Sequence, residues 1–180
     1  MNIVEPIRER DDIEAMKQFL FEWNPRNYIL FITGINTGLR ISDIRTLKVA
    51  QVAGTYINIR DKKTGKATKR RMTPTLKREL HDYIKGKRMD EYLFQSRNGR
   101  NKPISRQTAY HILKVAAEEC GLDNIGTHTM RKTYGYHLYR KEKDVAMLME
   151  QFNHSDQGTT LRYIGIKQDQ QDRVMSRFKI

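Results

Sequence analysis

Residues 26–38 constrain the fold more than any other part of the sequence. If this segment is a helix, it carries apolar side chains on nearly every side, which is typical of a helix buried at the centre of a protein. Gly38 is expected to end it, because glycine readily adopts the left-handed conformation of helix ends. Residues 11–22 repeat their apolar side chains at the i, i+3, i+4 spacing of a helix with one apolar face. The sequence therefore predicts helices packed around a central helix.

The periodicity of the apolar residues changes between residues 55 and 72. Tyr56, Ile57 and Ile59 indicate a strand, and the segment after it is expected to turn at Thr64–Gly65 and return as a second strand. Other helices are expected over residues 41–48, 74–86, 106–119, about 128–141, 143–151, 157–163 and about 169–177. We expect a mainly α fold with a small antiparallel β-sheet, in a single domain over residues 1–180 whose last helix forms a C-terminal tail.

The charge balance narrows the possible functions. Lys and Arg number 34 against 21 Asp and Glu, so the formal net charge is +13, which favours a polyanionic partner such as nucleic acid. A basic enzyme without such a partner is the alternative. The N-terminal segment lacks the apolar region of a secretory signal, and the longest apolar run, Tyr28–Ile32, is far too short to span a membrane. Since Cys120 is the only cysteine, we expect no disulfide, no metal site and a cytoplasmic protein.

Two blocks in the first half of the chain could contact an anion. In TGLRISD, Arg40 follows the glycine that ends the central helix, and Asp43 lies three residues later, where it could orient the Arg40 guanidinium. The expected hairpin is strongly basic and could neutralise DNA phosphates; its cations are Lys62, Lys63, Lys66, Lys69, Arg70 and Arg71. A surface ion pair and a solvated basic turn are the common alternatives.

The C-terminal third carries the remaining candidate residues. His128 and Arg131 in HTMR lie at i and i+3, on one face of the expected helix. His154 and Tyr163 lie nine residues apart, which on one unbroken helix would put them on opposite faces. They can meet only if the helix breaks between them, and Asp156 is a residue typical of a new helix start. Taken alone, each of these side chains could equally be an ordinary core or surface residue.

The order of these blocks resembles the catalytic domain of the tyrosine recombinases, or phage integrases. The resemblance covers about residues 25–170, and the matching segments are Thr37–Asp43, Lys63–Lys66, His128–Arg131 and His154–Tyr163. Three positions depart from the family pattern: Met130 replaces leucine, Lys132 stands where histidine is frequent, and Asn153 replaces glycine. Methionine conserves the volume of leucine, and asparagine tolerates a positive φ. The resemblance implies a catalytic domain without the N-terminal core-binding domain that family members use to close on DNA.

The resemblance also implies the reaction. The protein would be a site-specific recombinase or integrase that cleaves and rejoins DNA through a covalent 3′-phosphotyrosine, with no metal ion, cofactor or ATP. Tyr163 would be the nucleophile that attacks the phosphodiester. The charge that builds on the phosphate oxygens would be stabilised by Arg40, Arg131 and His154.

Proton transfers would fall to two further side chains. By the same resemblance, His128 would accept the proton of the tyrosine as general base, and Lys63 would protonate the leaving 5′-oxygen as general acid. Lys62 and Lys66 flank the same turn and are rivals for the acid role. Asp43 would hold the geometry of the site.

The expected partner is double-stranded DNA. Beyond the site, Arg106 and Gln107 at the start of a helix could contact it, as could Lys69, Arg70 and Arg71, and a solvated face is the alternative for each. Family habit implies a monomer in solution and a tetramer on DNA, associated with the nucleoid of a bacterium or derived from a phage. The tail has an apolar stripe that could dock in cis or on a neighbouring subunit, made of Val174, Met175 and Phe178.

Two other functions remain open at this point. A type IB topoisomerase-like enzyme would use the same nucleophile and cations to relax supercoiled DNA without joining two duplexes. A non-catalytic DNA-binding or regulatory module could keep the same fold without the reaction.

Overall fold

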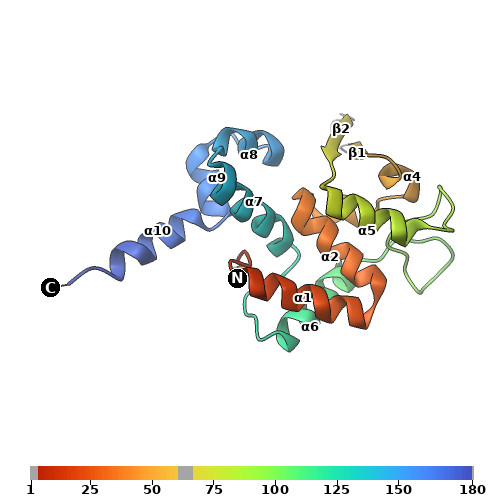
Figure 1. Ribbon diagram of the computed structural model, residues 1–180, viewed down its shortest axis with the longest axis horizontal. Helices are drawn as coiled ribbons and strands as arrows, with labels where there is room; N and C mark the ends of the chain where they lie inside the picture. Colours follow the sequence, from red (N-terminus) through yellow and green to blue (C-terminus); the bar gives the residue numbers. More distant parts are fainter. Residues whose placement is uncertain (1–3, 61–66, 180) are drawn as a thin grey trace.

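The computed structural model describes residues 4–60 and 67–179 (Figure 1). Its elements in chain order are α1 (Arg10–Trp23), α2 (Pro25–Thr37), α3 (Ile41–Ile44), α4 (Val49–Val52), β1 (Tyr56–Arg60), β2 (Ala67–Arg71), α5 (Pro74–Ile84), α6 (Arg106–Glu119), α7 (Thr129–Glu142), α8 (Val145–Phe152), α9 (Gln157–Tyr163) and α10 (Ile166–Met175). The strands pair antiparallel, with Tyr56 opposite Arg71. The predicted mainly α fold with a small antiparallel sheet is confirmed.

Helix α2 is the central helix. Its residues Ile29–Gly34 are buried, and α1, α5 and α7 pack against it (Figure 1). At its start the Asn24 side chain accepts a hydrogen bond from the amide of Arg26, and Gly38 ends it in the left-handed conformation with φ 63°. Because these end signals are local, the bounds of this helix follow closely from the sequence.

The close approach of α2 and α7 depends on Gly34. A Cβ added there would lie 2.8 Å from the Cβ of Met130. We expect Gly34→Ala to lower the free energy of unfolding by about 1 to 2 kcal/mol, because overpacking outweighs the gain in helix propensity. The measurement is urea unfolding. A Cβ at Gly54 meets no atom within 4 Å, so Gly54→Ala is the control, and equal stability of the two variants would contradict this packing.

Helix α7 belongs to two hydrophobic clusters. Its residue Met130 packs in the main core with α2, whereas Tyr136 packs in a smaller cluster formed by α7, α8, α9 and α10. The smaller cluster contains Leu148, Phe152 and Ile164 as well. The N-terminal half of α7 therefore lies where the two clusters meet.

The helix expected over residues 41–48 is interrupted. Helix α3 ends at Ile44, and the chain turns and then enters the short helix α4. The amide of Leu93 donates to the carbonyl of Leu47 at 2.8 Å, and the amide of Val49 donates to the carbonyl of Glu91 at 2.9 Å. These bonds to a distant segment replace the intrahelical bonds, so the prediction of one continuous helix was wrong.

Helix α10 begins at Ile166, three residues earlier than expected. Figure 1 shows that it points away from the rest of the molecule toward the C-terminus. The apolar side chains of the tail are exposed, at 66% for Val174, 63% for Met175 and 61% for Phe178. In the parts of the chain that the structure describes, no helix combines the length and the apolar character needed to cross a membrane.

Candidate active site

Arg131 is the buried centre of the candidate site. It lies in the first turn of α7 and is only 6% exposed. Its Nη1 donates to the carbonyl of Gly38 at 2.5 Å, and its Nη2 donates to the carbonyl of Phe152 at 3.2 Å. The side chain therefore ties the turn after α2 to the end of α8, while its remaining N–H groups can serve a ligand. Burial lowers the pKa of Arg131 to about 10, which leaves it positively charged at neutral pH.

The helix breaks between His154 and Tyr163, and their side chains meet. Helix α8 ends at Phe152, and the next residue, Asn153, adopts the left-handed conformation with φ 54°. The Asp156 side chain then caps α9 by accepting from the amide of Thr159. The rings of His154 and Tyr163 lie 5.3 Å apart between centroids, at 83°. The break that the nine-residue spacing requires is therefore present.

The hydroxyl of Tyr163 lies beside a second histidine. Nδ1 of His128, the residue that precedes α7, is 3.4 Å from the Tyr163 hydroxyl oxygen. This separation is longer than an ideal hydrogen bond, as is common for acid–base pairs in ligand-free sites, and a small approach of the two groups would allow proton transfer. Nδ1 of His154 is 3.1 Å from the hydroxyl of Thr160, which fixes the ring of His154 relative to α9.

The site is electrically positive. Burial raises the pKa of Tyr163, and the positive charges of Arg131 and Arg40 oppose this rise. Burial, followed by the neighbouring cations, lowers the pKa of both His128 and His154. Arg40 itself is exposed beside α3. Two arginines and two neutral imidazoles around one phenol form a site suited to an anionic group.

The other predicted site residues are placed differently. Asp43 is partly buried on α3 and its charge acts on Arg131, but among the described residues it forms no ion pair with Arg40. Lys62, Lys63 and Lys66 lie outside the described residues. Lys69, Arg71, Arg106 and Gln107 are exposed.

Arg70 is partly buried against α8. Its Nη2 donates to the carbonyl of Gln151 at 2.8 Å, and the side chain of Gln151 accepts from the hydroxyl of Tyr134 at 2.7 Å. This arginine therefore attaches β2 to the end of α8, beside the candidate site. It differs in this from the exposed Lys69 and Arg71 on either side of it.

Two residues of the site were missed in the sequence. The ring of Phe152 lies 4.1 Å from the guanidinium carbon of Arg131 and packs edge-on against the rings of His154 and Tyr163. The Lys132 ammonium lies 5.4 Å from the centroid of the Tyr163 ring. Phe152 gives no signal in the sequence beyond its place before Asn153, and Lys132 stands out only as a departure from the family pattern. In the described parts of the chain, no three His, Cys, Asp or Glu side chains group as a metal site.

This fold and this set of side chains define a tyrosine recombinase catalytic domain. The chain belongs to the phage integrase family, whose model matches residues 9–170, so the resemblance stated from the sequence is confirmed. It is 49% identical over 170 residues to the probable integrase/recombinase YoeC of Bacillus subtilis (strain 168), covering 94% of this chain and 93% of that protein. The chain spans about half the length of other curated relatives named tyrosine recombinases, from 41% to 54%.

Solved structures share the fold. The crystal structure of the XerA recombinase superposes with a TM-score of 0.75 at 18% identity, covering 98% of this chain and 67% of that one. The XerH site-specific recombinase bound to palindromic difH substrate, a post-cleavage complex, superposes with a TM-score of 0.74 at 17% identity, covering 98% of this chain and 54% of that one.

Proposed function

We propose that this protein is a catalytic domain that cuts and rejoins double-stranded DNA at a specific site through a covalent 3′-phosphotyrosine at Tyr163. The observation that carries the proposal is the placement of the Tyr163 hydroxyl 3.4 Å from Nδ1 of His128, next to the buried guanidinium of Arg131. The net charge of +13 supports a DNA partner, as does the DNA-bound state of the XerH structure.

The proposed reaction assigns one step to each side chain of the site. The phenol oxygen of Tyr163 attacks the phosphorus, its proton passes to His128, and the bond to the 5′-oxygen breaks. Arg40, Arg131 and His154 stabilise the charge on the non-bridging oxygens. Lys63 supplies the proton of the leaving 5′-hydroxyl, a role that rests on its place in the family pattern. Since the tyrosyl ester keeps the energy of the phosphodiester, the reverse attack by a 5′-hydroxyl rejoins the strand.

The exposed parts of the molecule fit partners of two kinds. Four exposed cationic or amide side chains would contact the DNA backbone or base edges: Lys69, Arg71, Arg106 and Gln107. The exposed apolar side chains at the end of α10 and just after it, Val174, Met175 and Phe178, would contact a neighbouring subunit in a tetramer assembled on DNA. Monomers in solution would then join only on their target.

The test is covalent trapping. The protein is incubated with a pool of nicked suicide duplexes of randomised sequence, and SDS gel electrophoresis separates any protein–DNA adduct. We expect an SDS-resistant adduct whose modified peptide, identified by mass spectrometry, contains Tyr163. DNA binding without an adduct would favour a non-catalytic module, and relaxation of supercoiled plasmid without recombinant product would favour a topoisomerase; either result would contradict the proposal.

The pH dependence of the adduct tests the base. Burial and the positive charge of Arg106 and Arg131 lower the pKa of His128, so the ring stays neutral below the ordinary histidine pKa of about 6.5. The single-turnover rate should therefore hold from pH 7 to below about 6.5 and fall only at more acidic pH. Circular dichroism checks that the protein is folded, and His111→Gln, at an exposed residue of α6, is the control. An acid limb at or above the ordinary value would contradict this role of His128.

A further inference from the structure

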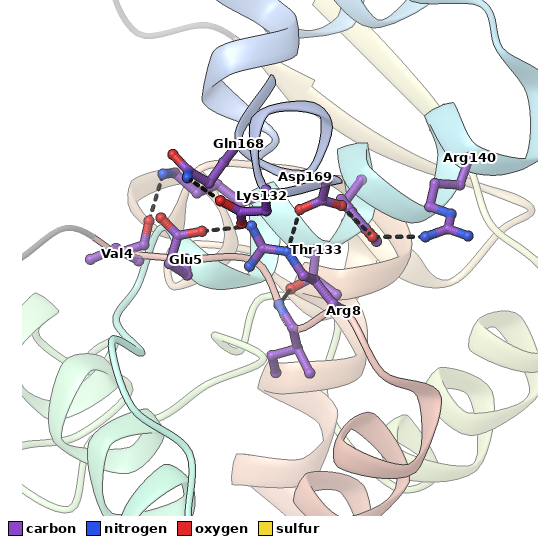
Figure 2. Close-up of polar contacts among 11 residues, drawn as sticks. Val4, Glu5, Arg8, Lys132, Thr133, Arg140, Gln168 and Asp169 are labelled. Carbon is purple, nitrogen blue, oxygen red and sulfur yellow. Dashed lines mark hydrogen bonds and ion pairs between the residues drawn. The ribbon is translucent and has the colours of Figure 1, made fainter. Parts of the chain in front are cut away.

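A polar network outside the site joins the N-terminus to α7 and α10. Residues Val4–Arg8, here called the strap, run across α7 (Figure 2). The amide of Ile7 donates to the hydroxyl of Thr133 at 2.9 Å, and the carbonyl of Ile7 is 2.9 Å from Nε2 of His137. The strap is therefore fixed to α7 over more than one turn.

Arg8 connects the strap to α10. Its Nε donates to Oδ1 of Asp169 at 2.8 Å, and Oδ2 of Asp169 accepts from the hydroxyl of Tyr136 at 2.8 Å (Figure 2). The hydroxyl of Tyr136 accepts in turn from Arg140 at 3.0 Å. Both side chains of the ion pair are largely covered, with 28% exposure for Arg8 and 26% for Asp169. Solvent screens such a pair less than an exposed one.

The strap also touches the chain directly around Tyr163. Gly165, two residues after Tyr163, has φ 85°, and a Cβ added to it would lie 3.0 Å from Nη2 of Arg8 and 3.1 Å from Cγ of Pro6. On the other side, the carbonyl of Val4 accepts at 2.5 Å from the ammonium of Lys132, which lies over the Tyr163 ring. The strap therefore holds both the turn that follows Tyr163 and a side chain that covers its ring.

We propose that Arg8 and Asp169 are positioning residues for Tyr163, an inference that rests on the proposed function. Asp169 lies in the first turn of α10, which begins at Ile166, so its bond to Arg8 fixes the chain that leaves Tyr163. The phenol already lies 3.4 Å from His128 in this arrangement, so the network holds the reactive geometry. A misplacement of about 1 Å can cost about a hundredfold in rate.

The test compares two carboxylates of α10. Asp169→Asn removes the carboxylate that ties Arg8 to α10 and leaves Arg8 its second ion pair, to Glu5 within the strap at 3.0 Å. Asp172→Asn makes the same change one turn later, at an exposed residue bonded to Gln168 on its own helix. With suicide duplexes at saturating protein, we expect Asp169→Asn to slow adduct formation by about tenfold to a hundredfold. The DNA affinity of both variants should match that of the wild type, and so should the rate of adduct formation by Asp172→Asn.

A double-mutant cycle separates positioning from general stability. Arg8→Met should lower the rate of adduct formation as much as Asp169→Asn does. The double variant should lose no more rate than either single variant. Arg8→Lys should keep most of the wild-type rate. Rates are measured well below each variant's unfolding temperature. Additive losses, a loss of DNA affinity in parallel with rate, or equal rates for Asp169→Asn and Asp172→Asn would overturn the inference. A wild-type protein that forms no adduct would instead overturn the proposed function.

Discussion

Replacing Tyr163 by phenylalanine is expected to abolish the covalent adduct. The change removes one oxygen atom, and that oxygen is the group placed 3.4 Å from Nδ1 of His128. Without it there is no atom to form the phosphate ester, so adduct formation with suicide duplexes should fall below detection. The ring keeps its packing against Phe152, so DNA binding and the unfolding temperature should stay close to those of the wild type.

Another tyrosine provides the matched control. Tyr139 lies near the end of α7, where its ring sits 5.5 Å from the ammonium of Lys143. Tyr139→Phe removes the same oxygen and should form adduct at the wild-type rate. Residual adduct in Tyr163→Phe, or a loss of adduct in Tyr139→Phe, would show that Tyr163 is not the nucleophile.

Replacing Arg131 by lysine should have the second-largest effect. Lysine keeps the positive charge but cannot bond two separate carbonyls and also present a fork to a phosphate. We expect the single-turnover rate to fall by about a hundredfold to a thousandfold, as for the loss of a preorganised donor. Leaving the buried carbonyls of Gly38 and Phe152 without a donor should also cost about 1–3 kcal/mol of stability, measured by urea unfolding.

Arg26→Lys is the control for the structural part of this effect. Arg26 is also partly buried and donates to a backbone carbonyl, that of Gln95 at 2.7 Å, at the start of α2. Its replacement should lower stability without slowing adduct formation by more than about twofold, since a site far from the reaction leaves the barrier unchanged. If both lysine variants lost rate in proportion to stability, Arg131 would have a structural role alone.

How much of this protein could be predicted depends on how local the signals are. Helices with their own start and stop residues, such as α2 with Asn24 and Gly38, follow from the sequence. The break between α8 and α9 follows as well, because Asn153 and Asp156 suit the end of one helix and the start of the next. The interruption after Ile44 does not, since it depends on backbone bonds to residues 91–93.

The site shows the same division. The residue pattern predicts which charged and aromatic side chains matter, and the structure brings His128, Arg131, His154 and Tyr163 together. The residue pattern does not reveal that Arg131 donates to two backbone carbonyls, because those carbonyls lie 93 and 21 residues away in the chain. Nor does it separate Arg70 from its exposed neighbours, since only the packing of β2 on α8 distinguishes them.

Helix α7 packs in both hydrophobic clusters, and this affects how the protein unfolds. Because α7 contributes side chains to both hydrophobic clusters, a loss of packing in one cluster displaces the helix and so disturbs the packing of the other. Arg131 lies on that helix and donates to the turn after α2, at Gly38, and to the end of α8, at Phe152. The protein should therefore lose its activity in the same unfolding transition in which both clusters lose their packing. An active site that still reacts would then show that both clusters are folded.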